Sequence, residues 1–436
     1  MSLGELVHRG ESGLAETLVR GSASKKEISI PAFKLLTPAW LCVGSGLLLS
    51  LLGVLAIDLG TDSPAGGLSA LAWRQAVFCV VGLLAALVVA LPHFRMLSVL
   101  AWPAYIASLA LLVFLLLPFV PASIVTPRNG TRGWIDLGPV DFQPSEVAKI
   151  AYVLVVARYM RWRSSHRRLR GLILPGLIAA PMVGLIVLQP DLGTASLFGP
   201  ALLGMLIAAG ARMRHIALIF AVAALAAPLS YPILRDHQKT RIVGLIRQLQ
   251  GDTSTASDIN FQSYTAQALI GAGGLAGAED TRARALVRYN RLPERHNDTV
   301  FAVAVTRWGL AGGMLLMALY LVWIAGALLT SAITLEPEGR LICVGVAGFV
   351  AAQAAVNIGM NLGILPIVGI TLPFISYGGS SLLTVWLMTG LIMNVGLHPA
   401  RPPFRPSFEY DERDGEGTIA AATGRPSGLN IFLINR

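Results

Sequence analysis

The chain has 436 residues, of which 54% are hydrophobic and 13% charged, and its formal net charge is +10 at pH 7. This composition excludes a water-soluble domain of ordinary proportions, because one aqueous core could not bury so many apolar side chains. The basic residues are dispersed among short loops, so we assign them to membrane topology and anionic lipid headgroups and expect no nucleic-acid partner.

Ten stretches of the chain are apolar enough to cross a bilayer, which takes roughly 20 residues of helix. They cover 38–58, 73–91, 99–117, 143–160, 172–189, 192–210, 215–233, 298–329, 341–362 and 376–397. We therefore predict an all-α, polytopic membrane protein with about ten transmembrane helices, whose membrane domain spans 38–397.

Polar tails flank this domain at 1–37 and 398–436, and the second tail, with its prolines and polar residues, is expected to be disordered. No short apolar run with a small-residue cleavage site follows residues 1–37, so we expect no cleaved signal peptide. Basic residues follow the second, fourth, sixth and eighth spans, so the positive-inside rule places both tails in the cytoplasm.

Two segments on the predicted outer side are longer than simple connections, namely 118–142 and the large loop 234–297 between the seventh and eighth spans. Loops of that length usually carry function. Within the second, 261–270 is expected to form a short helix on the membrane surface. Glycines at 271, 273, 274 and 277 indicate tight turns or close backbone contacts.

Polar side chains within a membrane are energetically costly and usually serve a function. In this sequence they lie on one predicted side of the membrane. Four separate stretches place them at predicted outer ends of spans, which points to one outward-facing cavity. The residues are Gln143, Ser145, Glu146 and Lys149 at the start of the fourth span, Gln189 and Asp191 at the turn between the fifth and sixth, Asp298 at the start of the eighth, and Asn357, Asn361 and segment 363–381 around the turn between the ninth and tenth.

Each of these groups also has a plainer interpretation. Glu146 and Lys149 could form only a local ion pair, because side chains three residues apart meet on a helix. Asp191 and Asp298 could each cap a helix. The Gly-Gly-Ser-Ser run at 378–381 could be a loose turn that lets helices pack closely.

Four ordered motifs carry a resemblance to a known family. They read GTRGWIDLG at 130–138 followed by FQPSEVAK at 142–149, QPDLGTA at 189–195, LPERHND at 292–298, and NIGM at 357–360 with GILP at 363–366 and LPFISYGGSS at 372–381. Over 38–397 the sequence resembles the shape, elongation, division and sporulation family, the RodA- and FtsW-type glycosyltransferases of bacterial cytoplasmic membranes.

The resemblance implies a peptidoglycan glycosyltransferase that polymerises lipid II on the outer face of the membrane during cell elongation or division. It also implies a class B penicillin-binding protein as partner. By this resemblance Asp298 occupies the family's essential acidic position, and Glu146 and Lys149 occupy its ion pair. The other candidates in these motifs for the substrate cavity are Arg132, Gln143, Asp191, Asn357, Ser376 and Ser380.

The chemistry of glycosyl transfer fits these residue types. A carboxylate such as Asp298 can take the proton from an acceptor hydroxyl. Lys239 and Arg241 in the outer loop, or a divalent Mg or Mn ion shared with the substrate pyrophosphate, can hold the departing group. The sequence shows no spacing of a dedicated metal site.

The chain departs from the family after Asp298, where Thr306 and Arg307 replace a usual Glu-Glu pair, and in the loop, where Gly277-Ala-Glu-Asp replaces Gly-Lys-Gly. Arg307 lies roughly 13 Å along a helix from Asp298. We expect it to face the cavity and either pair with Glu146, Asp191 or Asp298 or direct its charge toward the pyrophosphate; snorkelling is the alternative. These departures leave two other functions open, a non-catalytic scaffold and a lipid II transporter of the flippase type.

Overall fold

The structure of the chain is a computed structural model that describes residues 36–61, 67–121, 123–127, 131–138, 140–161, 163, 169–233, 236–250 and 260–398. The predicted cytoplasmic tails, 1–37 and 398–436, lie outside these residues except at positions 36, 37 and 398.

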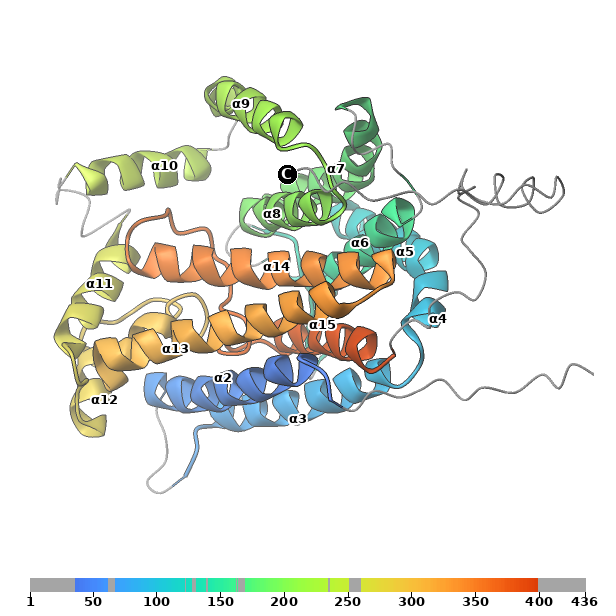
Figure 1. The fold of residues 1–436 in the computed structure, drawn as a ribbon. Helices are drawn as coiled ribbons and strands as arrows, with labels where there is room; N and C mark the ends of the chain where they lie inside the picture. Colours follow the sequence, from blue (N-terminus) through green and yellow to red (C-terminus); the bar gives the residue numbers. More distant parts are fainter. Residues whose placement is uncertain are drawn as a thin grey trace, which may run out of the picture.

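The described chain is almost entirely helical (Figure 1). Its first half contains α2 (Ala39–Gly60), α3 (Ala70–Ala90), α4 (Phe94–Val99), α5 (Ala101–Leu116), α6 (Pro144–Met160), η2 (Leu169–Leu172), α7 (Ile173–Leu188) and α8 (Leu192–Ala208). Its second half contains α9 (Met213–Ser230), η3 (Tyr231–Ile233), α10 (Asp236–Leu249), α11 (Phe261–Gly273), α12 (Asp280–Tyr289), α13 (Val300–Ile333), α14 (Pro337–Asn361) and α15 (Gly379–Leu397). Two short strands, β1 (Ile135–Asp136) and β2 (Asp141–Phe142), form an antiparallel hairpin.

Each predicted span coincides with one of these helices, the third being divided into α4 and α5. Six described helical segments are long and apolar enough to cross a membrane, namely α2, α3, η2 with α7, α13, α14 and α15, and α5 and α8 are shorter apolar helices. In lipid the backbone must satisfy its own hydrogen bonds, so apolar segments of this length become helices. The prediction of an all-α polytopic membrane protein is confirmed.

Small residues allow the helices to approach one another closely. A Cβ on Gly390 of α15 would lie 2.5 Å from the carbonyl oxygen of Ala86 on α3, and one on Gly82 of α3 would lie 2.7 Å from the ring of Trp386. A Cβ on Gly326 of α13 would lie 2.9 Å from Leu41 on α2. Contacts of this kind are the usual basis of helix association in membranes, where lipid is as apolar as the side chains.

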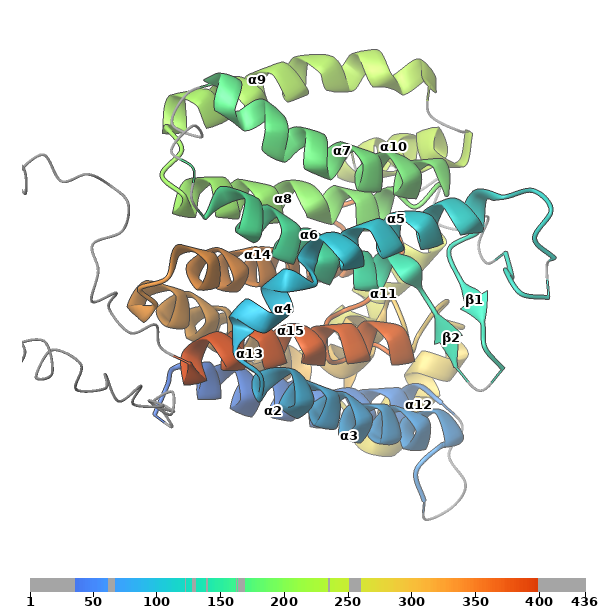
Figure 2. The same ribbon diagram turned by 90° about the vertical axis from the view of Figure 1, so that its right-hand side faces the viewer.

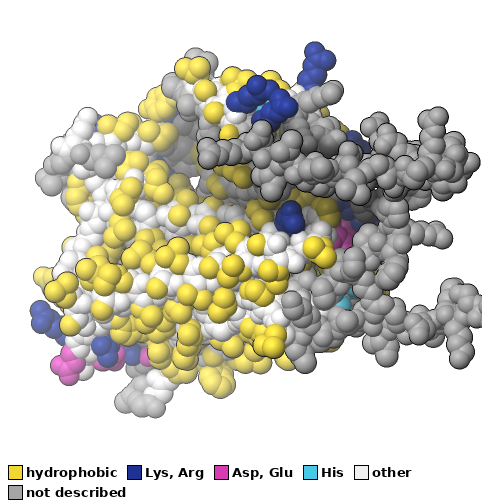
Figure 3. All heavy atoms as spheres, in the orientation of Figure 1, with side chains coloured by type: hydrophobic (Ala, Val, Ile, Leu, Met, Phe, Trp, Pro, Cys, Tyr) yellow, Lys and Arg dark blue, Asp and Glu magenta, His cyan; other side chains and the backbone are white. Residues whose placement is uncertain are grey.

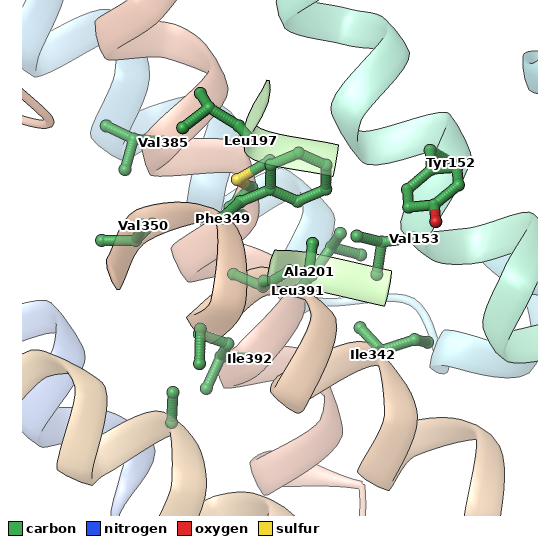
Figure 4. Close-up of a cluster of buried hydrophobic side chains, with 14 of the residues drawn as sticks. Tyr152, Val153, Leu197, Ala201, Ile342, Phe349, Val350, Val385, Leu391 and Ile392 are labelled. Atoms are coloured by element: carbon green, nitrogen blue, oxygen red, sulfur yellow. The ribbon is translucent and has the colours of Figure 1, made fainter. Parts of the chain in front are cut away.

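The centre of the bundle is closed by apolar side chains from α6, α8, α14 and α15 (Figure 4). Tyr152 packs edge-to-face on Phe349 with ring centroids 6.0 Å apart, and Phe198 packs on Phe349 at 5.1 Å. Edge-to-face geometry is favoured because ring edges are positive and ring faces negative. These contacts join the fourth, sixth and ninth spans into one core.

Apolar side chains also cover the outside of the bundle, as expected of a surface that faces lipid. Figure 3 shows a broad apolar layer on one face, with carboxylates visible only near its two ends. Examples of exposed apolar residues are Trp73, Val88 and Leu321. A water-soluble protein would not expose a continuous surface of this kind.

The two ends of the bundle carry different polar groups. At one end Arg95 pairs with Glu336 at 2.9 Å, and Arg161 pairs with Glu338 at 2.5 Å. The other end carries the β1–β2 hairpin and α12, which lie toward the same side in Figure 2. The predicted outer loops are therefore gathered at one end of the molecule.

Residues of the large loop fold onto the spans instead of standing apart. The predicted helix at 261–270 is present as α11, and it packs along α13. α13 is kinked at Gly309, whose φ of 68° belongs to the left-handed region. Segment 274–278 covers this kink, because Gly274 and Leu275 accept hydrogen bonds from Leu310 and Ala311 at 2.8 and 3.2 Å.

Candidate active site at the outer end of the bundle

Asp298 lies in the turn that connects α12 to α13, and two asparagines of α14 hold its backbone. The carbonyl oxygen of Asp298 accepts hydrogen bonds from the side-chain amides of Asn357 at 3.0 Å and Asn361 at 2.8 Å. Asn357 also donates to the carbonyl oxygen of Ile370 at 2.7 Å. One side chain therefore joins the turn before α13 to the turn between α14 and α15.

The carboxyl group of Asp298 is not used as a helix cap. The N-cap position of α13 is Thr299, and no side-chain capping bond is formed there. The half-buried Asp298 side chain instead faces Gly369, where an added Cβ would lie 3.5 Å from Oδ2. The capping interpretation of Asp298 is wrong, which leaves its carboxyl group available for chemistry.

Burial raises the pKa of Asp298 from 3.8 to about 7. The negative charges of Glu294 and Asp191 contribute to this rise by repulsion, whereas the nearby positive charge of Arg241 opposes it. Desolvation disfavours the ionised form of a carboxyl group, and nearby negative charges add to that effect. Four ionisable side chains from three different segments thus influence one another around this position.

Asp191 does act as a cap, as one of the sequence interpretations proposed. It is the N-cap of α8, and its carboxylate accepts a hydrogen bond from the amide of Thr194 at 2.9 Å. Burial raises the pKa of Asp191, the Thr194 bonds lower it, and the charges of Glu146 and Lys149 act in opposite directions. The charge of Asp191 therefore interacts both with Asp298 and with the ion pair on α6.

Glu146 and Lys149 form the predicted ion pair, with Nζ and Oε1 2.8 Å apart and side chains only 6% and 3% exposed. The Lys149 ammonium also donates to Gln353 on α14 at 3.1 Å. Gln353 in turn donates to the backbone oxygen of Thr371 at 3.0 Å, and the Thr371 hydroxyl lies 3.0 Å from that of Ser381. A continuous polar chain thus connects α6, α14 and the start of α15.

The remaining polar residues of the motifs fasten the outer turns to one another. Ser380 donates to the carbonyl oxygen of Asp141 at 2.6 Å and accepts from the amide of Gln143 at 3.2 Å. Ser376 donates to the carbonyl oxygen of Asn297 at 2.7 Å, directly before Asp298. Both serines therefore hold the backbone around the site.

Two of the predicted cations lie on α10. Arg241 is exposed and acts electrostatically on Asp298, whereas the Lys239 ammonium lies 6.0 Å from the centre of the Tyr231 ring. α10 is attached to α11 and to the residue before it, since Gln248 donates to the Ser263 hydroxyl at 3.0 Å and Asn260 donates to the carbonyl oxygen of Gly244 at 2.7 Å. This attachment holds Arg241 beside the site.

Arg132 is placed differently from the central group. Its guanidinium donates to the carbonyl oxygen of Val120 at 3.2 Å, within the loop that precedes α6. Arg132 thus holds its own loop, and its predicted place in a substrate cavity remains a prediction.

The predicted partners of Arg307 were wrong. Its side chain pairs with Asp280 of α12, with Nε and Oδ1 3.0 Å apart, and donates to the carbonyl oxygen of Ala278 at 3.2 Å. In the sequence, the start of α13 is an isolated apolar span, and Glu146, Asp191 and Asp298 are the acids expected near it. In the structure the loop returns along this part of α13 and brings its own carboxylate to Arg307.

Sequence reasoning missed three residues that contribute to the site. Glu294 acts on Asp298, Gln353 connects Lys149 to Thr371, and Gln75 of α3 is buried and donates to the carbonyl oxygen of Ser376 at 3.0 Å. The two glutamines were detectable, because an amide within an apolar span requires a hydrogen-bonding partner. Glu294 lies in an already recognised motif.

Among the described residues, no group of three or more His, Cys, Asp or Glu side chains could hold a metal ion by itself. Carboxylates near the site are nevertheless suited to Mg²⁺, which commonly binds one or two carboxylates together with substrate phosphates. A divalent ion would therefore need oxygen ligands from the substrate.

Comparisons with known proteins agree with the sequence motifs. The sequence model of the FtsW, RodA and SpoVE proteins, described as "Cell cycle protein", matches residues 37–400. A protein of Nitrosococcus halophilus named "Probable peptidoglycan glycosyltransferase FtsW" is 32% identical over 337 residues, which cover 76% of this chain and 84% of that protein. The "Peptidoglycan glycosyltransferase MrdB" of Escherichia coli K12 is 37% identical over 276 residues, covering 62% of this chain and 72% of that protein.

Solved structures show the same fold. A chain from a study entitled "Structural coordination of polymerization and crosslinking by a peptidoglycan synthase complex" superimposes with a TM-score of 0.68 at 31% identity, covering 84% of this chain and 98% of that one. The rod shape determining protein RodA of Thermus thermophilus gives a TM-score of 0.59 at 28% identity, with coverage of 85% and 99%. With the family model matching nearly the whole described domain, this chain belongs to the FtsW, RodA and SpoVE family of cell cycle proteins.

Proposed function

We propose that this protein is a peptidoglycan glycosyltransferase that polymerises lipid II into glycan strands on the outer face of the bacterial cytoplasmic membrane. Two relatives support this function by their names, "Probable peptidoglycan glycosyltransferase FtsW" and "Peptidoglycan glycosyltransferase MrdB". In this orientation the end of the bundle that carries Asp298 faces outward and both termini lie in the cytoplasm. Arginines at the opposite end, including Arg95 and Arg161, support the orientation by the positive-inside rule.

The observation that carries the proposal is the environment of Asp298. Its carboxyl group is half-buried, forms no helix cap, and has a pKa raised to about 7. A general base works best when its pKa lies near the working pH, because it is then both ionised and basic enough to take a proton. The pKa of Asp298 therefore suits a general base near neutral pH.

The proposed reaction uses this carboxylate directly. Asp298 takes the proton of the acceptor sugar hydroxyl while the hydroxyl oxygen forms a bond to the anomeric carbon of the donor sugar. The bond from that carbon to the pyrophosphate oxygen breaks, and its electron pair leaves with the lipid pyrophosphate. The new glycosidic bond lengthens the strand by one disaccharide.

Positive charge is needed where the pyrophosphate departs. Arg241 is near enough to Asp298 to lower its pKa, so its guanidinium is the proposed partner of the leaving group. Lys239, on the same helix, is a second candidate. A Mg²⁺ or Mn²⁺ ion, if bound mainly by the substrate phosphates, would supply further positive charge to the leaving group and leave Asp298 free to act as the base.

We propose a class B penicillin-binding protein as the partner that crosslinks the new strand. The likeness to a chain from a peptidoglycan synthase complex supports a partner of this kind.

The experiment is a polymerisation assay with purified protein, its class B penicillin-binding protein and lipid II. The wild type and an Asp136→Asn control, which changes an exposed carboxylate of the outer loop, should form glycan strands. Asp298→Asn should form none. A folded wild-type complex that makes no polymer would refute the proposed function in favour of a scaffold or a transporter.

A further inference from the structure

The turn that carries Asp298 has a backbone that must be held by its surroundings. Within this turn Arg291 and Glu294 have φ angles of 46° and 47°, in the left-handed region that residues other than glycine rarely adopt. Such conformations persist only where neighbouring structure imposes them. The turn begins directly after α12, so the attachment of α12 determines where the turn starts.

Arg284 attaches α12 to α2. Its guanidinium lies 2.6 Å from the Asp58 carboxylate and donates to the carbonyl oxygen of Asp58 at 2.7 Å and that of Thr61 at 3.3 Å. The Asp58 side chain is only 11% exposed. The planar fork of an arginine can satisfy several acceptors at once, which a lysine cannot do.

Asp280 connects this contact to α13. Its carboxylate accepts from Arg284 at 3.1 Å and from Arg307 at 3.0 Å. Slight burial raises the pKa of Asp280, but hydrogen bonds and charge attraction from the two arginines outweigh it, and the net effect is a lowered pKa. Asp58, Arg284, Asp280 and Arg307 thus form a network with two negative and two positive charges, which we call the α12 network.

Backbone contacts beside the network leave little freedom for movement. A Cβ on Gly277, which has a φ of 89°, would fall directly on the carbonyl oxygen of Arg307. The amide of Ala278 donates to the carbonyl oxygen of Thr306 at 3.0 Å. At the end of α2, a Cβ on Gly60 would lie 3.5 Å from the carbonyl oxygen of Arg295, inside the turn. The end of α2 therefore touches both α12 and the turn.

We propose that Arg284 is a positioning residue for the reaction: through the α12 network it fixes α12 between α2 and α13, and so holds the turn 290–299 in the conformation that presents Asp298. This role rests on the proposed function. Arg284 acts through the turn and makes no contact with the reacting atoms.

The first test measures the turn itself and needs no substrate. In Arg284→Met, hydrogen exchange of the Asn297 and Thr299 amides, which donate to the carbonyl oxygen of Glu294, should accelerate about tenfold or more relative to wild type. Arg161→Met is the matched control, since Arg161 also pairs with a buried carboxylate, Glu338, but at the opposite end of the bundle. The control should leave exchange in the turn unchanged.

The second test measures the acid limb of the pH–rate profile for lipid II polymerisation. Desolvation is the main cause of the raised pKa of Asp298, so a loosened turn that admits water should move the midpoint of this limb toward lower pH. The charged groups around Asp298, namely Glu294, Arg241 and Asp191, are unchanged in the variant. Arg161→Met should keep the wild-type midpoint even if it lowers stability.

The two tests separate the possible failures. A folded Arg284→Met protein with wild-type exchange in the turn and a wild-type midpoint would overturn the positioning role. Accelerated exchange in a chain whose wild type forms no polymer would refute the proposed function while keeping the mechanical link. If Arg284→Met does not fold, Arg284→Lys replaces it: a smaller acceleration in the turn supports the inference, and unchanged exchange overturns it.

Discussion

Asp298→Asn should stabilise the folded protein at alkaline pH, although it should remove activity. Folding raises the pKa of Asp298 from 3.8 to about 7, so the folded environment disfavours the ionised carboxylate and its charge destabilises the folded state. This rise corresponds to about 4 kcal/mol at about 1.4 kcal/mol per pH unit. Because the side chain is only half-buried and water screens its charge, we expect about 2 kcal/mol.

The sign of the effect depends on pH. Below pH 3.8 the carboxyl group is protonated in both the folded and unfolded states, and burial of its charge costs nothing. Between pH 3.8 and about 7 the unfolded state ionises first, so stability falls, and above that range the full cost persists. Asparagine carries no charge and avoids this cost.

The assay is thermal unfolding of the detergent-solubilised protein at about pH 8.5 and about pH 4.5. Asp298→Asn should melt above wild type at the higher pH, and the difference should shrink at the lower pH. Asp136→Asn, at an exposed position, is the control and should change the melting temperature little. If Asp298→Asn melted below wild type at pH 8.5, the carboxylate would be stabilising and the reasoning from burial would be wrong.

Three further predictions concern the contacts around the site. Removing either partner of the buried Glu146–Lys149 pair should cost about 3–5 kcal/mol of unfolding free energy, and the double change should cost less than the sum; additivity in a double-mutant cycle would refute the coupling. Arg307→Glu should lower the melting temperature, because it places a second carboxylate beside Asp280, and an unchanged melting temperature would show that the pair contributes nothing. Gly277→Ala should cost about 1–3 kcal/mol through backbone strain and a clash, measured by the same melting assay, whereas a neutral effect would mean that segment 274–278 can move.

The spans were predictable because lipid imposes one solution on an apolar segment. Each of the ten stretches is helical, the third being divided into α4 and α5, and the helix at 261–270 is present as part of α11. The Glu146–Lys149 pair was also predictable, since two side chains three residues apart on a helix must meet. Local spacing and one-sided placement were sufficient for both.

Contacts that depend on the return path of the chain were not predictable. Arg307 pairs with Asp280, 27 residues earlier in the chain, because the chain turns at Gly277 and the backbone there packs against the kink at Gly309. Lys149 donates a hydrogen bond to Gln353, 204 residues away, because α6 packs on α14. Neither partner follows from a local pattern, because Gln353 lies outside the family motifs, and Asp280 and Arg307 lie at two separate departures from the family.

The most direct test of the account is the initial rate of lipid II polymerisation by the purified complex between about pH 5 and about pH 9. With Asp298 as the base, the wild-type rate should rise with pH through a midpoint near 7, because the carboxylate must be ionised to accept the proton. Asp298→Asn should be inactive across the whole range while remaining folded. A folded Asp298→Asn protein that still forms strands, with the same rise near pH 7, would contradict the central claim.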